Sequence, residues 1–378
     1  MRVYLDNAAT TPLEPEVMEA MLPYMKQHFG NPSSIHSFGR EVKAAIEQAR
    51  KKVAGYFNVS PSEIFFTSGG TEANNTAIRC SIRDLGITHA ITSRIEHHAV
   101  LHTLEELEKQ VRVKLSFVSL DENGHVDLEH LEKLLDANAR SLVSLMHANN
   151  EIGNLLPLQN VAQLCAKYDA VFQCDTVQTV AHYEINLSEI PLHFISCAAH
   201  KFHGPKGIGF LYINSKIKIH PFIYGGSQER NMRGGTENVY GIIGLAKALE
   251  IAYSNLDADR KHISSLKEYL AESLTENIPG IIFNGDFMGK SLYTVLNVSF
   301  PATDFAEMLL FNLDIAGIAV SGGSACSSGS ETGSHVLKAL NVDEARPAVR
   351  FSFSKYNTKE EIDVMIDGVK KAIAFLKK

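Results

Sequence analysis

Short β-rich runs alternate with longer amphipathic runs between Glu63 and Ile213, and this alternation most limits what the chain can fold into. Most of the β-rich runs are uniformly apolar, as strands buried on both faces of a sheet are. Alternating strands and helices favour a mostly parallel sheet covered by helices. The seven expected strands are residues 64–67, 90–93, 114–118, 142–146, 171–174, 194–198 and 210–213. The clearest helices between them are residues 72–83, 99–110, 128–135 and 161–168.

The pattern changes after about Leu256, where a second region begins. The elements expected there are a charged helix over 260–276, an apolar run over 292–300, a helix over 302–313, a strand over 349–353 and a last helix from Lys359. The length of 378 residues also exceeds the usual size of one domain. We therefore expect a large α/β domain over 15–255 and a smaller α+β domain formed by 1–14 and 256–378.

The overall charge and the cysteines limit the class of protein. A formal net charge of -7 gives the chain no bulk attraction to nucleic acid or to an anionic membrane. No apolar run approaches the roughly 20 residues that span a bilayer, and Arg2 and Asp6 interrupt the start where a secretory core would continue. The five cysteines are widely spaced and include no CxxC pair, which favours free thiols over disulfides or structural zinc. We expect a cytoplasmic protein that binds no metal, membrane or nucleic acid.

The turn over residues 66–72, which reads FTSGGTE, has the composition of an anion site between a strand and a helix. Two glycines let the backbone come close to a ligand, and the N–H groups at a helix N-terminus attract negative charge. Gly70 and the hydroxyl of Thr71 are the candidate binding groups. An ordinary turn with a helix cap has the same pattern, so the motif alone is not specific.

Two candidate residues follow expected strands of the sheet. Lys201 comes shortly after the strand 194–198, and burial would lower its pKa and free the amine for a Schiff base. Asp175 ends the strand 171–174, where a carboxylate needs a partner such as a pyridinium N–H. Strand ends on one edge of a parallel sheet are where ligands bind. A surface lysine and a helix-capping aspartate remain open as alternatives.

Three further residues carry reactive or charged groups. His97 could stack on a flat cofactor and shuttle protons, whereas we expect its neighbour His98 to be structural. Cys326 lies in a loop rich in Gly and Ser, where we expect a mobile and exposed thiol, while we expect the other four cysteines to be buried. Arg350 in an apolar strand favours bidentate binding of a carboxylate, with a structural ion pair as the alternative.

As a set, these motifs resemble those of the NifS/IscS-type cysteine desulfurases, which are class-V aminotransferase relatives. The resemblance covers nearly the whole chain. The matching segments are LDNAATTP at 5–12, GNPSS at 30–34, FTSGGTE at 66–72, MHANNEIG at 146–153, His200-Lys201, MRGGT at 232–236 and GSAC at 323–326. The resemblance implies a type-I fold dependent on pyridoxal 5'-phosphate (PLP), with a mostly parallel seven-stranded sheet. It also implies a homodimer with active sites at the interface.

The resemblance further implies how the cofactor is held. Lys201 binds it as a Schiff base, His97 stacks on its ring and moves protons, and Asp175 pairs with the pyridine nitrogen. The remaining cofactor contacts are Gln178 to the ring oxygen, and Gly70, Thr71, His200 and, from the other subunit, Thr236 to the phosphate.

The same resemblance implies the reaction. Asn150 and Arg350 hold the carboxylate of the substrate L-cysteine. Cys326 attacks the substrate sulfur, keeps it as a persulfide and leaves L-alanine. The sulfur then passes to an acceptor protein, either an iron–sulfur scaffold or a thiolation enzyme. The thiolate form is required, because a thiol is a poor nucleophile.

Two features depart from the family pattern. Ala198 stands where IscS-like members commonly have a phosphate-binding serine. The chain also ends at Lys378, just after the last expected helix, whereas IscS-type proteins carry a further tail that helps to dock the scaffold. Which sulfur acceptor is served therefore stays open.

Other functions on the same fold are the alternatives, namely a selenocysteine lyase, an aminotransferase or a catalytically silent scaffold. An aminotransferase needs no thiol, so Cys326 argues against it. A silent scaffold has no need of Lys201, His97 and Asp175, and all three are present.

Overall fold

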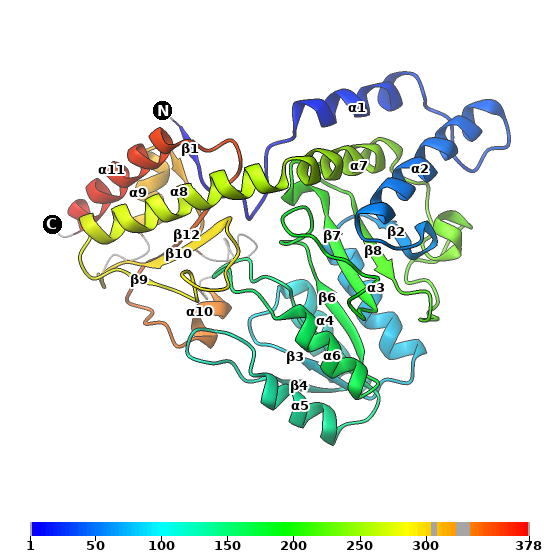
Figure 1. Cartoon of the computed structure of the whole chain (residues 1–378), viewed down its shortest axis with the longest axis horizontal. Coiled ribbons are helices and arrows are strands. Elements are labelled where there is room, and N and C mark those ends of the chain that lie inside the picture. Colours follow the sequence, from blue (N-terminus) through cyan, green and yellow to red (C-terminus); the bar gives the residue numbers. More distant parts are fainter. Residues whose placement is uncertain (1, 304–307, 323–332, 377–378) are drawn as a thin grey trace.

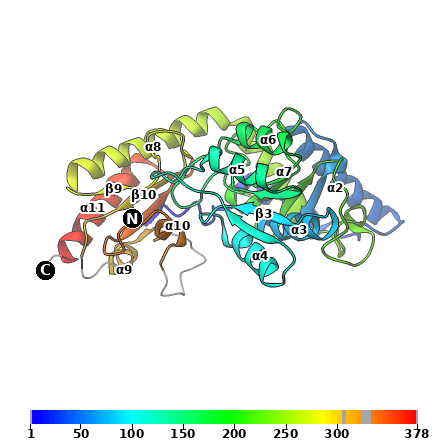
Figure 2. The ribbon, with the colours of Figure 1, turned by 90° about the horizontal axis from the view of Figure 1, so that it is seen from below.

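The computed structural model describes residues 2–303, 308–322 and 333–376. It shows a large sheet flanked by helices beside a smaller group of strands and helices (Figures 1 and 2). The large sheet has the strand order β2-β8-β7-β6-β5-β3-β4. Its strands are β2 (Ile64–Thr67), β3 (His89–Thr92), β4 (Lys114–Phe117), β5 (Ser141–Ser144), β6 (Val171–Asp175), β7 (Phe194–Ala198) and β8 (Gly209–Ile213).

All seven expected strands are present, with small shifts at their ends. The pairs from β4 through β3, β5 and β6 to β7 are parallel. β8 runs antiparallel to both of its neighbours, β2 and β7. The mostly parallel seven-stranded sheet is therefore confirmed, with β8 as an antiparallel insertion near one edge.

Helices cover both faces of this sheet because side chains alternate between the faces along each strand. Leu142 of β5 packs with α3 (Gly70–Asp84) and α4 (His98–Lys109), whereas the next residue, Val143, packs in the core on the other face. The helices on that second face are α1 (Pro15–Lys26), α2 (Ser37–Tyr56), α5 (Leu128–Ala137), α6 (Leu158–Lys167) and α7 (Val239–Ser254). A 3-10 turn, η1 (Pro61–Glu63), leads into β2.

The smaller part has a hydrophobic core of its own, which the N-terminal residues Val3 and Leu5 join. It contains a three-stranded antiparallel sheet of order β12-β10-β9 and a parallel pair of β1 and β11. Its elements are β1 (Val3–Tyr4), α8 (Leu256–Asn277), β9 (Ile282–Phe283), β10 (Val295–Ser299), α9 (Met308–Ile315), β11 (Ile318–Ala319), α10 (His335–Ala339), β12 (Ala348–Ser352) and α11 (Lys359–Leu376). The helix expected over 302–313 is described from Met308 to Ile315, and residues 304–307 lie outside the described residues. The domain boundary at residue 255 stays a prediction.

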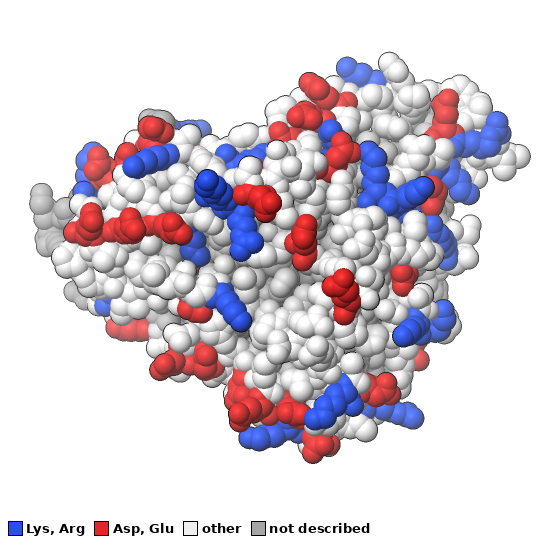
Figure 3. Space-filling view, in the orientation of Figure 1, with Lys and Arg blue, Asp and Glu red and all other residues white. Residues whose placement is uncertain are grey.

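The surface and the cysteines add two observations. Acidic and basic side chains are interspersed on the face seen in Figure 3, and acidic ones form a row along α8. No helix in the described ranges is long and apolar enough to cross a membrane. The four cysteines expected to be buried are buried free thiols, namely Cys80, Cys165, Cys174 and Cys197. Burial raises the pKa of each of these thiols, which makes them poor nucleophiles.

Candidate active site

A cavity of about 210 Å³ opens where β5, β6 and β7 end, beside the N-terminus of α3. Nine of the candidate residues line it together: Gly70, Thr71, His97, Asn150, Asp175, Gln178, His200, Lys201 and Arg350. The lining is completed by Ala8, Ala9, Asn74, Met146, Ala148, Val177 and Ala198. Segments from both ends of the chain therefore meet at the edge of the sheet where ligands bind in open α/β folds.

Lys201 lies at the end of η2 (Ala199–Lys201), a single 3-10 turn directly after β7. Its Nζ donates to the carbonyl oxygens of Ala8 at 2.6 Å and Ala9 at 2.9 Å. The amine is thus held between the large sheet and the N-terminal segment. Burial, together with the positive charges of Lys201 and Lys206, lowers the pKa of the neighbouring His200 to about 4. His200 is therefore a neutral imidazole at neutral pH.

Asp175 ends β6 and is 5% exposed. Its Oδ2 accepts from Asn74 Nδ2 at 2.6 Å. Its Oδ1 accepts from the backbone N–H of Val177 at 3.0 Å and from Ser196 Oγ at 3.3 Å. These donors hold the carboxylate in one orientation. The sequence analysis missed Asn74, although its position one helical turn after Gly70 places both residues on the same face of α3.

The turn before α3 has the geometry of an anion site. Gly69 is the N-cap of α3. The first hydrogen bond of the helix is donated by the backbone N–H of Ala73 to the carbonyl oxygen of Gly69. The N–H groups before Ala73 lie at the positive end of the helix, ahead of its first internal bond. A Cβ at Gly70 would lie 2.6 Å from Cγ2 of Val177, so this close approach requires glycine. The Ala198 side chain lies beside the same position, at 3.8 Å from that Cβ, and offers no hydroxyl.

His97 caps α4, and its Nδ1 accepts from the backbone N–H of Ala99 at 3.1 Å. The neutral ring therefore carries its proton on Nε2. His98 does not line the cavity, and its ring lies against those of His102 and His335, with centroid distances of 4.6 and 4.4 Å. This packing agrees with the expectation that His98 is structural.

Glu96, directly before His97, is a buried acid that the sequence analysis did not single out. Its Oε1 accepts from Ser93 Oγ at 2.9 Å and from the backbone N–H of Met146 at 3.0 Å. The side chain therefore links the ends of β3 and β5 and fixes the turn that carries His97. Burial, with a contribution from the charge of Asp175, raises the pKa of Glu96 to about 8.

Arg350, in β12, forms the structural ion pair considered for it and also lines the cavity. It is 1% exposed, and its Nη2 forms an ion pair with Asp6 Oδ1 at 2.8 Å. Its Nη1 donates to the carbonyl oxygen of Asn150 at 2.9 Å. Ser321 Oγ also donates to Asp6 Oδ1 at 2.8 Å. The guanidinium therefore lines the cavity in a fixed orientation while one of its ends neutralises a carboxylate.

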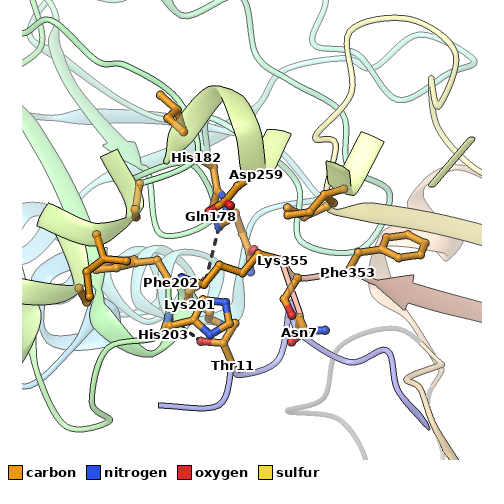
Figure 4. Close-up of a pocket in the computed structure, with 18 of the residues that line it drawn as sticks. Asn7, Thr11, Gln178, His182, Lys201, Phe202, His203, Asp259, Phe353 and Lys355 are labelled. Carbon is orange, nitrogen blue, oxygen red and sulfur yellow. Dashed lines mark hydrogen bonds between the residues drawn. The ribbon is translucent and has the colours of Figure 1, made fainter. Parts of the chain in front are cut away.

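Figure 4 shows a second cavity, of about 40 Å³, with Gln178, His182 and Lys201 on its wall. It shares Ala8, Gln178 and Lys201 with the first cavity. It has room for about two or three water molecules. On its wall, His182 bonds through Nδ1 to Tyr293 Oη at 2.9 Å, and its Nε2 lies 3.5 Å from the carbonyl oxygen of Lys201. Burial lowers the pKa of His182 to about 4, so a neutral imidazole supports the main chain at Lys201.

Two candidate residues do not lie in the cavity. Thr236 is exposed and does not line it. Cys326 lies outside the described residues, which leave out 323–332. Their roles therefore stay predictions.

Comparisons with known proteins agree with the site. The family model described as Aminotransferase class-V matches residues 3–365. Over 99% of its length, the chain is 45% identical to a cysteine desulfurase IscS of Dictyoglomus turgidum, and the match covers 95% of that relative. A NifS-like protein of known structure matches all of both chains with a TM-score of 0.91 and 39% identity. A structure of SspA in complex with cysteine matches 95% of the chain and 100% of SspA, with a TM-score of 0.82 and 30% identity.

These matches span nearly the full length, so they cover both the large sheet and the smaller part that brings Arg350 to the cavity. They confirm the resemblance drawn from the motifs. The chain belongs to the class-V aminotransferase family, as a PLP-dependent cysteine desulfurase of the IscS and NifS type.

Proposed function

We propose that the 210 Å³ cavity binds PLP and L-cysteine, and that Cys326 takes the sulfur of cysteine for delivery to an acceptor protein. The observation that most directly supports this proposal is that Lys201, Asp175 and the turn at Gly70 line one cavity. The amine of Lys201 matches the aldehyde of PLP, and the carboxylate of Asp175 matches its ring nitrogen. The turn at Gly70 matches its phosphate. The residues present therefore fit this cofactor.

When bound, PLP supplies an electron sink for the bonds at the substrate α-carbon. Lys201 would hold the cofactor aldehyde, with its Nζ positioned by the carbonyls of Ala8 and Ala9. Asp175 would keep a proton on the ring nitrogen, and Asn74 holds this carboxylate in place. The contacts assigned to the rest of the cofactor are Gly70, Thr71 and His200 to the phosphate and Gln178 to the ring oxygen.

His97 would lie over the cofactor ring and move protons there. Its Nδ1 is occupied by the N–H of Ala99, so Nε2 is the atom that gives or takes the proton. Glu96 would keep this ring in position through its bonds to Ser93 and Met146.

Arg350 and Asn150 would bind the carboxylate of the substrate. Arg350 is already oriented by Asp6 and by the Asn150 carbonyl, so little side-chain entropy is lost when the substrate binds. The complex of the related SspA with cysteine supports cysteine as the substrate.

Sulfur transfer would proceed by attack of the Cys326 thiolate on the sulfur of the bound cysteine. An S–S bond forms, the C–S bond breaks, and its electron pair stays with the carbon, which is then protonated. The products are alanine and a persulfide on Cys326, so atoms and electrons balance without another oxidant or reductant. The buried thiols, such as Cys80, are unsuited to this role because burial raises their pKa.

We further propose a homodimer in which Thr236 contributes to the phosphate site of the partner subunit. Its exposure and its position away from its own cavity support this role. The acceptor of the sulfur would be an iron–sulfur scaffold or a thiolation enzyme, as the resemblance to NifS/IscS-type cysteine desulfurases implies.

The test is a reaction of the PLP-loaded protein with L-cysteine and a reductant. We expect equal amounts of alanine and sulfide. Cys326→Ser should retain PLP and still change the cofactor absorbance with cysteine, but it should release no sulfide. Cys80→Ala serves as the control and should remain active. Loss of PLP from Cys326→Ser, or sulfide release by it, would contradict the role given to Cys326.

A further inference from the structure

The segment from Glu229 to Thr236 begins with an unfavourable backbone conformation. Glu229, Arg230 and Asn231 have φ values of 43°, 55° and 65°. Three consecutive residues other than Gly in the left-handed region are sterically unfavourable. Glu229 and Arg230 lie in η3 (Gln228–Asn231), whose interior is not helical there. Interactions with the rest of the molecule must hold this segment in place.

A buried ion pair holds the beginning of the segment. Arg50 contacts Glu229 through two hydrogen bonds of 2.7 and 2.8 Å, and both side chains are almost fully buried. Glu229 Oε2 also accepts from the backbone N–H of Phe66 at 2.8 Å. The segment is therefore attached to β2 just before the anion turn.

A second ion pair attaches the segment to the anion turn itself. Arg233 Nε donates to Glu72 Oε1 at 3.0 Å, and Nη2 donates to Oε2 at 3.2 Å. Glu72 Oε2 also accepts from the backbone N–H of Ser68 at 2.9 Å. Burial opposes ionisation of Glu72, but the hydrogen bonds from Arg233 and Ser68 outweigh it and lower the pKa of this carboxyl. The pair is therefore charged at neutral pH, and its bidentate geometry fixes the direction of the segment.

Both attachments lead to residues 66–72, the run that presents Gly70 and Thr71 to the cavity of the same subunit. Thr236, three residues after Arg233, is exposed and lies away from this cavity. We infer that Arg233 is a positioning residue that serves the partner's active site by anchoring the segment that carries Thr236. This inference rests on the proposed homodimer, in which Thr236 reaches the partner's phosphate site.

The arrangement has a direct consequence for the dimer. Residues 66–72 would serve the phosphate of their own subunit directly and that of the partner through Arg233 and Thr236. Removing the ion pair should therefore weaken cofactor retention mainly in the other subunit. A purely structural ion pair would weaken retention in its own subunit instead, because Glu72 belongs to that subunit's anion turn.

The test variant is Arg233→Met combined with Glu72→Gln. It removes both charges, so no unpaired charge stays buried, and Gln can still accept from Ser68 N. The matched control is Arg230→Met on the same segment. Arg230 pairs with the more exposed Glu47 at 2.8 Å and donates to the Pro61 carbonyl, and none of its hydrogen bonds or ion pairs among the described residues reaches residues 66–72. Dimer mass and the midpoint of thermal unfolding check that each variant folds.

The experiment uses mixed dimers made from two differently tagged subunits, with Lys201→Ala silencing one site. In the first arrangement, one subunit carries the test variant and the other carries Lys201→Ala. The intact lysine then lies in the variant subunit and receives Thr236 from a subunit with Arg233. In the second arrangement, both changes lie in one subunit, so the intact lysine receives Thr236 from the variant. The readout is the rate at which lysine-bound PLP is lost during dialysis.

We expect PLP loss in the second arrangement to be at least tenfold faster than in the first, and the Arg230→Met control to show no such difference. Equal rates in the two arrangements, or faster loss in the first, would overturn the inference while leaving the proposed function intact. A protein that is a fully active monomer by light scattering would overturn the proposed homodimer itself and the inference with it.

Discussion

The two walls of the cavity are built in different ways. One wall consists of the ends of strands of the large sheet and the turns that directly follow them, with Asp175 at the end of β6 and Lys201 after β7. The other wall comes from the two ends of the chain, where Asp6 and Arg350 form an ion pair next to Ala8. The first wall presents the groups that fit the cofactor, and the second presents the guanidinium that fits the substrate.

This difference indicates that the two walls have different functions. Groups on the sheet wall are positioned by local geometry, since a strand end and the next helix set their direction. Groups on the other wall depend on contacts such as Arg350 with the Asn150 carbonyl, which exist only when the smaller part is folded against the sheet. Variants of the sheet wall should therefore change cofactor retention, and variants of the other wall should change substrate binding.

The largest effect is expected for Lys201→Ala on the sheet wall. In the proposed site the cofactor would lose its covalent attachment with this amine, and the Ala8 and Ala9 carbonyls would lose a donor. We expect no detectable desulfuration and no absorbance of lysine-bound cofactor, as measured by sulfide release and by the visible spectrum. Substantial turnover of cysteine by this variant would disprove the assignment.

The next largest effect is expected for Arg350→Lys on the other wall. Lys keeps the charge beside Asp6 but loses the second hydrogen bond, the one to the Asn150 carbonyl. Lys could not keep the bond to Asp6 and also make a bidentate contact with the substrate carboxylate. One hydrogen bond to a charged group contributes about 1.5–3 kcal/mol, so its loss should raise KM by roughly 10- to 100-fold. PLP content should be unchanged. If the variant lost PLP and kept its KM, the division between the walls would be wrong.

The two walls also differ in how far they could be predicted. The strands follow from apolar runs, and the residues at their ends come from short motifs and from the resemblance that these motifs support. Eight of the nine candidates in the cavity, all except Arg350, belong to this wall. The pairing of Arg350 with Asp6 and of Arg233 with Glu72 could not be predicted, because no spacing in the sequence specifies which distant charges meet. The antiparallel direction of β8 and the burial of Glu96 likewise depend on the assembled sheet.

A pH-dependent effect, on stability and not on activity, is expected for Glu96→Gln behind the sheet wall. The pKa of Glu96 is raised from 4.5 to about 8 in the folded protein, so the unfolded state releases this proton first. Folding stability from this group is complete below pH 4.5 and is lost as the pH rises toward 8, by roughly 1.4 kcal/mol for each pH unit. Gln cannot ionise and keeps an acceptor for Ser93 and Met146.

The thermal stability of Glu96→Gln relative to the wild type should therefore increase between pH 5 and pH 8. Unfolding midpoints across this range provide the measurement, and the exposed Glu122→Gln sets the baseline. A constant difference between variant and wild type would show that Glu96 does not stay protonated in the folded protein.

The smallest effect is expected for Ala198→Ser, which adds a hydroxyl to the sheet wall beside Gly70. If the cofactor phosphate lies at this turn, the new hydroxyl would supply one more charge-assisted hydrogen bond. Such a bond contributes about 1.5–3 kcal/mol, but a water molecule at the same place already recovers part of it. We therefore expect PLP to dissociate up to about tenfold more slowly with little change in turnover. Dialysis of the two proteins side by side tests this, and equal or faster loss from the variant would place the phosphate elsewhere or show it to be fully bonded already.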